Sequence, residues 1–219
     1  MQKKYIYMLV ILLIILFIYI IVHHSKTIET YDGGEPAFYI FGYGSLVNDY
    51  SRKETVLLKK APVMATISEN FGYQRAYGFK SEDSPHRVFG LQQNPSYNSK
   101  INGVLFKVNS EDLARLDFRE KGYEKIVIPW NYVINREALV NENKLEKNYD
   151  KYTLFTYFPG DEMSINKNND SVSYNYLDKV YDGFYDKVDD DSFLTEFINN
   201  TDNSTLPSDY TTVDNWINS

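Results

Sequence analysis

An uninterrupted apolar run near the start of the chain divides the sequence into two parts with different physical requirements. Residues 5–22 contain no charged residue, no glycine and no proline. Eighteen residues rise about 27 Å as a helix, close to the thickness of a bilayer core. A cleaved signal peptide normally has a shorter apolar region followed by small residues, whereas HHSK follows here at 23–26. We therefore expect one membrane anchor over residues 1–26.

The charges that flank this run indicate an orientation. Lys3 and Lys4 precede the run and Lys26 follows it. The excess of positive charge on cytoplasmic loops favours a cytoplasmic N-terminus. We expect a single-pass membrane protein whose globular part is outside the cytosol or in a lumen, with the cytosolic side as the alternative.

The composition of the chain excludes several kinds of catalytic and binding site. The chain has no cysteine, which excludes a thiol nucleophile, a cysteine-ligated metal and a disulfide. It has only three histidines, and His23 and His24 adjoin the apolar run, so we expect no metal and no other cofactor. The chain has 23 basic and 30 acidic residues, and only two of these 53, Lys3 and Lys4, lie before position 26. The segment from Lys26 onward therefore has 21 basic and 30 acidic residues, a net charge of −9. This balance argues against nucleic-acid binding.

The remainder alternates short apolar strands with polar turns and has few helices. A polar linker over 27–36 precedes a domain over 37–198, and 199–219 forms a polar tail that we expect to be poorly ordered. A helix starting at the cap Asn109-Ser110 should end near Gly122, and a second helix should cover 174–185. Residues 51–60 suit a short helix or a turn, and 159–170 a polar loop. Strands are expected at 37–41, 63–68, 74–79, 87–92, 102–108, 124–133 and 152–157. The fold class is α+β, a compact mixed β-sheet or small β-barrel with a few flanking helices.

The first expected strand stops abruptly in Gly42-Tyr43-Gly44-Ser45-Leu46. The third glycine of a dinucleotide-binding fingerprint is missing, and Ser45 lacks the flanking glycines of a nucleophile elbow. Glycines allow the backbone to approach a ligand closely, and successive free N–H groups bind anions such as carboxylates. An ordinary tight turn is the alternative interpretation.

Glu120 stands at the expected end of the first helix, in Leu116-Asp117-Phe118-Arg119-Glu120-Lys121-Gly122-Tyr123. The negative end of the helix dipole and partial burial among aromatic residues should both raise the pKa of its carboxyl group. A raised pKa suits a group that takes and returns a proton near neutral pH. The alternative is a solvated glutamate paired with a neighbouring cation.

Together these two elements resemble the gamma-glutamylcyclotransferase-like family, including its glutathione-specific and plant-defence-related branches. Tyr43-Gly44-Ser45-Leu46 matches the family's stretch after the first strand, and Glu120 before Gly122-Tyr123 matches its acidic position. Residues 173–183 more weakly resemble its late tyrosine-containing helix. The resemblance covers about residues 39–184, and the membrane anchor departs from the family pattern.

The resemblance implies an enzyme that releases 5-oxoproline from a gamma-glutamyl amine or peptide. It implies that Glu120 is the general acid and base, and that the backbone of Tyr43, Gly44, Ser45 and Leu46 binds the glutamyl group. Tyr123 is expected as a wall or hydrogen-bond donor. Arg75 is expected either to pair with a substrate carboxylate or to lie on the surface, whereas Asp117 and Arg119 are expected as structural partners.

The expected partner is therefore a small gamma-glutamyl molecule, with no cofactor, and the membrane contacted through residues 5–22. A catalytically silent, membrane-anchored binding module of the same fold is the alternative, followed by an anchored structural protein. The sequence predicts neither the identity of the substrate nor the oligomeric state.

Overall fold

The computed structural model describes residues 30–31, 35–80, 85–93, 99–161, 163–165, 172–188 and 190–219. The predicted membrane anchor, residues 5–22, lies outside these ranges. Across the ranges that are described, no helix has both the length and the apolar character that crossing a bilayer requires.

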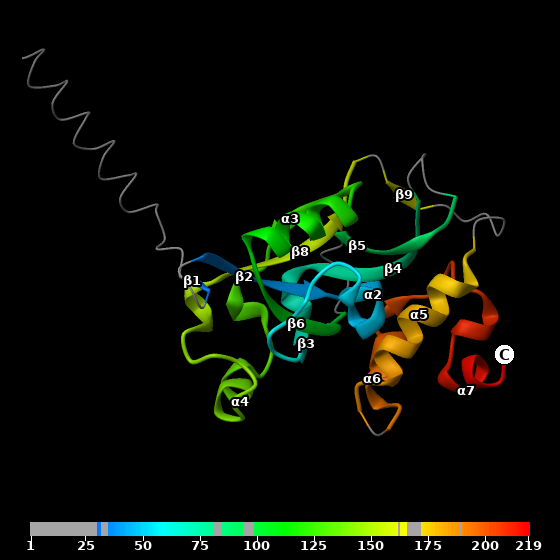
Figure 1. Ribbon diagram of the computed structural model, residues 1–219. Helices are drawn as coiled ribbons and strands as arrows, with labels where there is room; N and C mark the ends of the chain where they lie inside the picture. The colour runs from blue at the N-terminus through cyan, green and yellow to red at the C-terminus, as the bar shows by residue number, and fades with distance from the viewer. Residues whose placement is uncertain are drawn as a thin grey trace, which may run out of the picture.

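A six-stranded mixed sheet forms the centre of the described molecule (Figure 1). Five of its strands follow the order β3-β6-β2-β8-β7, and β1 pairs with the start of β2. β2 is antiparallel to β6 and parallel to β8, so it is held on both sides. This sheet comprises β1 (Thr30–Tyr31), β2 (Glu35–Gly42), β3 (Val63–Ile67), β6 (Ile101–Asn109), β7 (Tyr123–Val127) and β8 (Thr153–Pro159).

A smaller, four-stranded sheet lies against the first. β4 pairs antiparallel with β5 and β9, and parallel with β10 from the end of the chain. The sheet comprises β4 (Tyr73–Lys80), β5 (Val88–Gln93), β9 (Ser164–Ile165) and β10 (Thr201–Asp202). The predicted α+β class with mixed sheets is confirmed. The short strand β9 lies inside the segment predicted to be a loop, because it completes one edge of β4.

The ends of the helices are set by nearby capping residues, and the sequence predicts some of these ends correctly. In α3 (Ser110–Arg119) the side chain of Asn109 accepts the N–H of Asp112, and Gly122 takes the left-handed conformation (φ 97°) just after the helix. α5 covers Tyr174–Tyr185, as predicted. Within 51–60, the helix α2 (Asp49–Lys53) starts two residues early and is followed by turns.

Two further predictions differ from the structure. The strand expected over 124–133 ends at Val127, because Pro129 has no N–H to donate to a sheet and a 3-10 turn (Trp130–Tyr132) follows it. The tail expected to be poorly ordered packs on the domain instead. It contributes β10, a 3-10 turn at Ser208–Tyr210 and α7 (Val213–Ile217), while α6 (Ser192–Asn199) precedes it.

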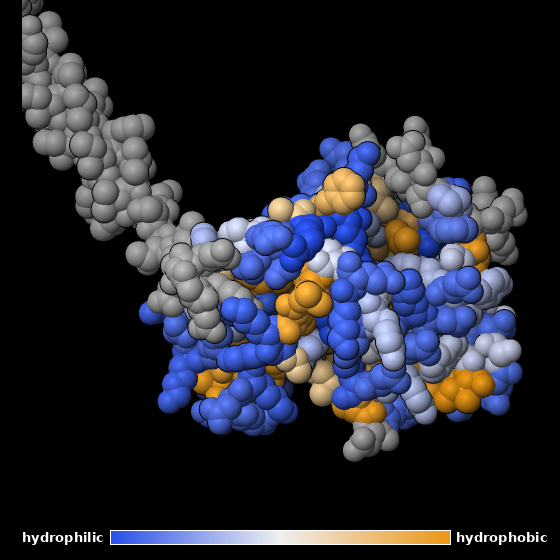
Figure 2. Space-filling view, viewed as in Figure 1, coloured by the Kyte–Doolittle hydropathy of each residue, from blue (hydrophilic) through white to orange (hydrophobic). Residues whose placement is uncertain are grey.

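The tail is ordered because it buries apolar side chains and completes a sheet. Tyr210 and Val213 belong to the same hydrophobic cluster as residues of α5 and α6. Figure 1 shows α5, α6 and α7 together at one end of the molecule, opposite β1 and α4 (Arg136–Asn141). The face seen in Figure 2 is mostly hydrophilic, with hydrophobic residues in separate small groups.

Candidate active site

A cavity of about 230 Å³ lies where β5, the edge strand of the smaller sheet, meets the end of β2. Its lining comes from segments that are far apart in the sequence. They are the loop after β2, the first residues of β5, the end of α3, and one tyrosine each from β7, β8 and α5. Six predicted site residues line this cavity together: Tyr43, Gly44, Ser45, Leu46, Glu120 and Tyr123.

The loop after β2 turns directly into a single 3-10 turn over Ser45–Val47. The N–H of Val47 donates to the carbonyl of Gly44 at 2.9 Å. Such a turn leaves its first N–H groups without an acceptor inside the turn, and here these belong to Ser45 and Leu46. The loop is thus a tight turn with free N–H donors at its start, and anion binding by these donors stays a prediction.

Glu120 is the residue at which α3 ends. Its own N–H still donates to the carbonyl of Leu116 at 2.8 Å, and its side chain is only 15% exposed. Burial raises the pKa of the Glu120 carboxyl above its ordinary value, and the neighbouring Arg119 guanidinium acts in the opposite direction. The expected direction of the shift is therefore present, with burial as its main cause.

Arg119 connects Glu120 to the loop after β2. Its Nε lies 3.0 Å from Oε1 of Glu120, and its Nη2 donates to Oγ of Ser45 at 3.1 Å. The same guanidinium donates to the carbonyl and the hydroxyl of Ser51 at 2.5 and 2.9 Å. One planar group therefore fixes the carboxylate relative to the loop.

Three tyrosine hydroxyls support the cavity wall. The hydroxyl of Tyr43 donates to the carbonyl of Tyr157 at 2.6 Å. Tyr123 donates to the carbonyl of Phe89 at 2.8 Å, and the N–H of Phe89 donates to the hydroxyl of Tyr176 at 3.1 Å. Both backbone groups of Phe89 are therefore satisfied by side chains from other elements. The Tyr123 bond holds the edge of β5 against β7 of the larger sheet, the Tyr176 bond holds it against α5, and the Tyr43 bond joins the loop after β2 to β8.

Gly183 allows α5 to bring Tyr176 to the cavity. A Cβ atom on Gly183 would lie 2.6 Å from the backbone nitrogen of Asn48, at the start of α2. The helix therefore packs directly on the backbone that follows the site loop, where a larger side chain would hold the two apart. The weak resemblance over 173–183 includes this glycine.

Arg75 lies outside the cavity, and it is not on the surface either. Its side chain is fully buried, and its guanidinium bonds to Asn102, to Thr201 and to the carbonyl of Phe197. Burial lowers its pKa to about 9. The surface alternative is wrong, and the expected contact with a substrate carboxylate is not supported by this position. Arg75 instead joins β4 and β6 to the C-terminal segment.

Asp117 does not line the cavity, but it holds a residue that does. Its carboxylate accepts the hydroxyl of Tyr157 at 2.9 Å and pairs with Lys125 at 2.7 Å. Asp117 and Arg119 thus both hold other residues in place. Seven lining residues were absent from the predicted site: Phe41, Gly42, Val88, Phe89, Arg119, Tyr157 and Tyr176. Phe41, Gly42 and Arg119 adjoin predicted site residues in the sequence, and Tyr176 lies in the predicted helix over 174–185. Val88, Phe89 and Tyr157 reach the cavity through sheet pairing.

Comparisons with known proteins give matches among solved structures alone. No family model matches the sequence, and no curated protein does. Structural comparison finds a gamma-glutamyl cyclotransferase at 17% identity and a TM-score of 0.44, covering 68% of this chain and 79% of that one. It also finds an uncharacterized protein from Homo sapiens at 16% identity and a TM-score of 0.48, over 73% and 86% of the two chains. YkqA from Bacillus subtilis matches at 17% identity and 0.45, over 67% of this chain and 48% of its own. One of these three structures is a gamma-glutamyl cyclotransferase, and all three matches are below 25% identity and below a TM-score of 0.5.

Proposed function

We propose that the protein is a gamma-glutamyl cyclotransferase that releases 5-oxoproline from a gamma-glutamyl amine or peptide. The observation that carries this proposal is the arrangement of Glu120 and the Tyr43–Leu46 loop. Both line one cavity, and the single guanidinium of Arg119 contacts the Glu120 carboxylate and the Ser45 hydroxyl.

The reaction needs a folded substrate and a proton carrier. The alpha-amine of the glutamyl group attacks its own gamma-carbonyl carbon, forming a C–N bond and closing a five-membered ring. The bond from that carbon to the leaving nitrogen then breaks. Glu120 takes a proton from the attacking amine and delivers one to the leaving nitrogen, so no water is consumed.

The loop supplies the electrostatic part of the mechanism. Negative charge develops on the gamma-carbonyl oxygen as the ring closes, and the first N–H groups of the 3-10 turn, from Ser45 and Leu46, donate to it. Enclosed sites for drug-sized ligands have volumes of roughly 300–1,000 Å³. The cavity of about 230 Å³ therefore suits the glutamyl group alone, with the leaving amine outside it.

The proposal is tested with the purified full-length protein and a panel of gamma-glutamyl amines and dipeptides. Release of 5-oxoproline is measured by mass spectrometry. We expect turnover on at least one member, and Glu120→Gln should lower the rate by at least about 10²-fold, as loss of a general base does. Glu111→Gln is the matched control, because Glu111 is exposed on the same helix and pairs with Arg115.

Two results separate the alternatives. Thermal stabilisation by a panel member without turnover would favour a silent binding module of the same fold. A folded protein that shows neither stabilisation nor turnover would reject both readings.

We also propose that residues 5–22 anchor the protein in a membrane, on the strength of their uninterrupted apolar composition. The full-length chain should then remain with the membrane fraction after alkaline carbonate washing. Release into the supernatant would reject the anchor.

A further inference from the structure

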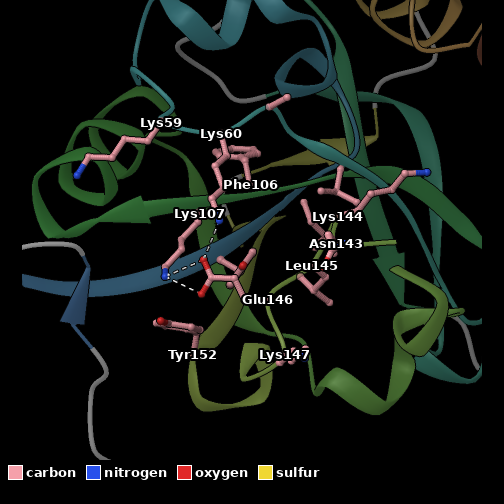
Figure 3. Close-up of a pocket in the computed structure, with 14 residues that line it drawn as sticks. Lys59, Lys60, Phe106, Lys107, Asn143, Lys144, Leu145, Glu146, Lys147 and Tyr152 are labelled. Carbon is pink, nitrogen blue, oxygen red and sulfur yellow. Dashed lines mark hydrogen bonds and ion pairs between the residues drawn. The ribbon is translucent and has the colours of Figure 1, made fainter. Parts of the chain in front are cut away.

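A second and larger cavity, of about 480 Å³, lies away from the candidate active site. No residue lines both cavities. The second one lies between β2, β6, the segment before β3 and the segment that follows α4, as Figure 3 shows. Five lysines line it: Lys59, Lys60, Lys107, Lys144 and Lys147.

The charge at this cavity is opposite to that of the rest of the domain. Glu146 is the one carboxylate of the lining, and Glu142 lies beside it, paired with Lys144 at 2.7 Å. Within the described residues, five ammonium groups against these two carboxylates give a local net charge of +3. The chain from Lys26 onward has a net charge of −9, because Lys3 and Lys4 are the only charged residues before it and the whole chain has a net charge of −7. A basic concave site in an acidic domain attracts anions to one place.

Glu146 marks the point where two ammonium groups converge. Its carboxylate oxygens lie 3.0 and 3.2 Å from Nζ of Lys107, and 3.8 Å separates Oε1 from Nζ of Lys60. Figure 3 shows the Glu146 carboxylate between these two side chains, while Lys59 and Lys144 extend away from it. The protein therefore already holds one anionic group at this position.

Lys107 is the buried half of the pair. Its side chain is 16% exposed, and its Nζ lies 3.9 Å from the centre of the Tyr152 ring. Burial alone would lower its pKa, but hydrogen bonds to Tyr152 and Glu146 outweigh burial and raise the pKa above its ordinary value. Lys107 thus places a positive charge against the aromatic wall of the cavity.

The remaining wall is apolar and aromatic. Tyr39, Leu105 and Tyr152 line it and belong to one hydrophobic cluster. The volume exceeds what a bare inorganic anion needs and falls within the range typical of small-molecule sites. The cavity therefore suits a ligand with an anionic group and an organic part.

We propose that this cavity binds a phosphate-bearing molecule, whose phosphate group takes the place of the Glu146 carboxylate between Lys60 and Lys107. Lysine ammonium groups bind phosphate as point charges and need no fixed fork geometry. The organic part of the ligand then covers Tyr39 and Leu105. A soluble organic phosphate and a phospholipid headgroup present the same chemistry to this site.

The proposal requires the ligand to displace the Glu146 carboxylate, which therefore competes with the phosphate group for Lys60 and Lys107. Binding of inorganic pyrophosphate and of adenosine diphosphate to the full-length protein is measured by titration calorimetry. Glu146→Gln should tighten binding of at least one probe by at least about tenfold, as expected when a negative charge beside a bound anion is removed. The double variant Lys60→Gln, Lys107→Met should weaken it by at least about tenfold. Thermal unfolding of each variant shows that it is folded.

A separate arm uses vesicles of phosphatidylcholine with and without phosphatidylserine. Anionic vesicles that bind the Glu146→Gln variant more tightly than the wild type, while both soluble probes bind weakly, assign the site to a lipid headgroup. The reverse pattern assigns it to a soluble phosphate. Lys179→Gln is the control, because Lys179 is exposed on α5 and does not line the cavity. The proposal is overturned if Glu146→Gln binds neither probes nor vesicles more tightly than the wild type, or if Lys179→Gln weakens binding as much as the double variant.

Discussion

A carboxyl group that accepts a proton and later returns it works best when its pKa is close to the pH at which the enzyme operates. Glu120 is subject to two opposing influences. Burial raises the pKa, and Arg119 lowers it. The residue before Glu120 therefore sets both the position of the carboxylate and part of its acidity.

Replacing Arg119 by glutamine should change the pH dependence of catalysis in a defined direction. Without the guanidinium, only burial acts on Glu120, so its pKa rises further. The reaction needs the carboxylate form, which becomes populated only above that pKa, so the acidic limb of the kcat/KM profile should move to higher pH. At pH 7 the rate should fall by about tenfold or more, because Ser45 also loses its partner.

Arg119→Lys separates position from charge. Lysine restores a cation beside Glu120 but lacks the planar fork, so the acidic limb should return toward lower pH while the maximal rate stays reduced. Arg115→Gln is the control, because Arg115 is on the same helix and bonds with Glu111 and Asp112. An unchanged acidic limb in Arg119→Gln would contradict the role assigned to Arg119.

At the scale of elements, most helices and strands follow from local patterns. The capping side chain of Asn109 and the apolar spacing along 174–185 identify α3 and α5, because helix ends and faces are determined by nearby residues. The proximity of Glu120 to the Tyr43–Leu46 loop, in contrast, does not follow from any local pattern. The residues alone indicated two separate elements, and only the family resemblance joined them.

Other features depend on partners distant in the sequence and had no local signal. Arg75 lies on a strand with no unusual sequence pattern, yet its side chain is buried, because Asn102 and Thr201 accept hydrogen bonds from its Nη1. Tyr157 and Val88 reach the cavity through strand pairing alone. The polar composition of 199–219 predicted disorder, because composition does not show that β4 has an edge for β10 to pair with.

Gly183→Ala tests the close packing of α5. In an isolated helix, alanine would be favoured over glycine by about 1 kcal/mol. Here the added Cβ meets the backbone of Asn48, which cannot move aside as a flexible side chain does. We expect the free energy of unfolding, measured with urea, to fall by about 1–3 kcal/mol.

The control for this prediction is Lys179→Ala on the exposed face of the same helix, which should change stability by less than about 0.5 kcal/mol. If Gly183→Ala were as stable as the wild type or more so, the contact between α5 and the start of α2 would be looser than described.

At the scale of the whole molecule, the C-terminal segment is part of the domain. Thr201 pairs with Arg75 in register, and its hydroxyl both accepts from Arg75 at 3.3 Å and donates to the carbonyl of Phe197 at 2.6 Å. One threonine thus links α6, β10 and the buried cation of β4.

Thr201→Val keeps the shape and removes the hydroxyl. It leaves the buried carbonyl of Phe197 and the Arg75 guanidinium each with one partner fewer, so we expect a loss of about 1–3 kcal/mol in the free energy of unfolding. Thr211→Val is the matched control. The Thr211 hydroxyl also donates to a carbonyl, that of Ser208, but in an exposed turn, so its removal should cost less than about 0.5 kcal/mol. Equal losses in the two variants would contradict the linking role of Thr201.

The parallel pairing of β10 with β4 also bears on how the protein is made. During synthesis, β4 and β5 leave the ribosome long before residues 201–202, the strand that completes their sheet. Until then, residues 75–76 on that edge of β4 have no strand partner, and Arg75 lacks one of its hydrogen-bond acceptors, the Thr201 hydroxyl. A nascent chain therefore carries an exposed segment of strand edge, and a cation with one hydrogen-bond partner fewer, until residues 201–202 have been synthesised, and an unpaired strand edge is prone to incorrect pairing during that time.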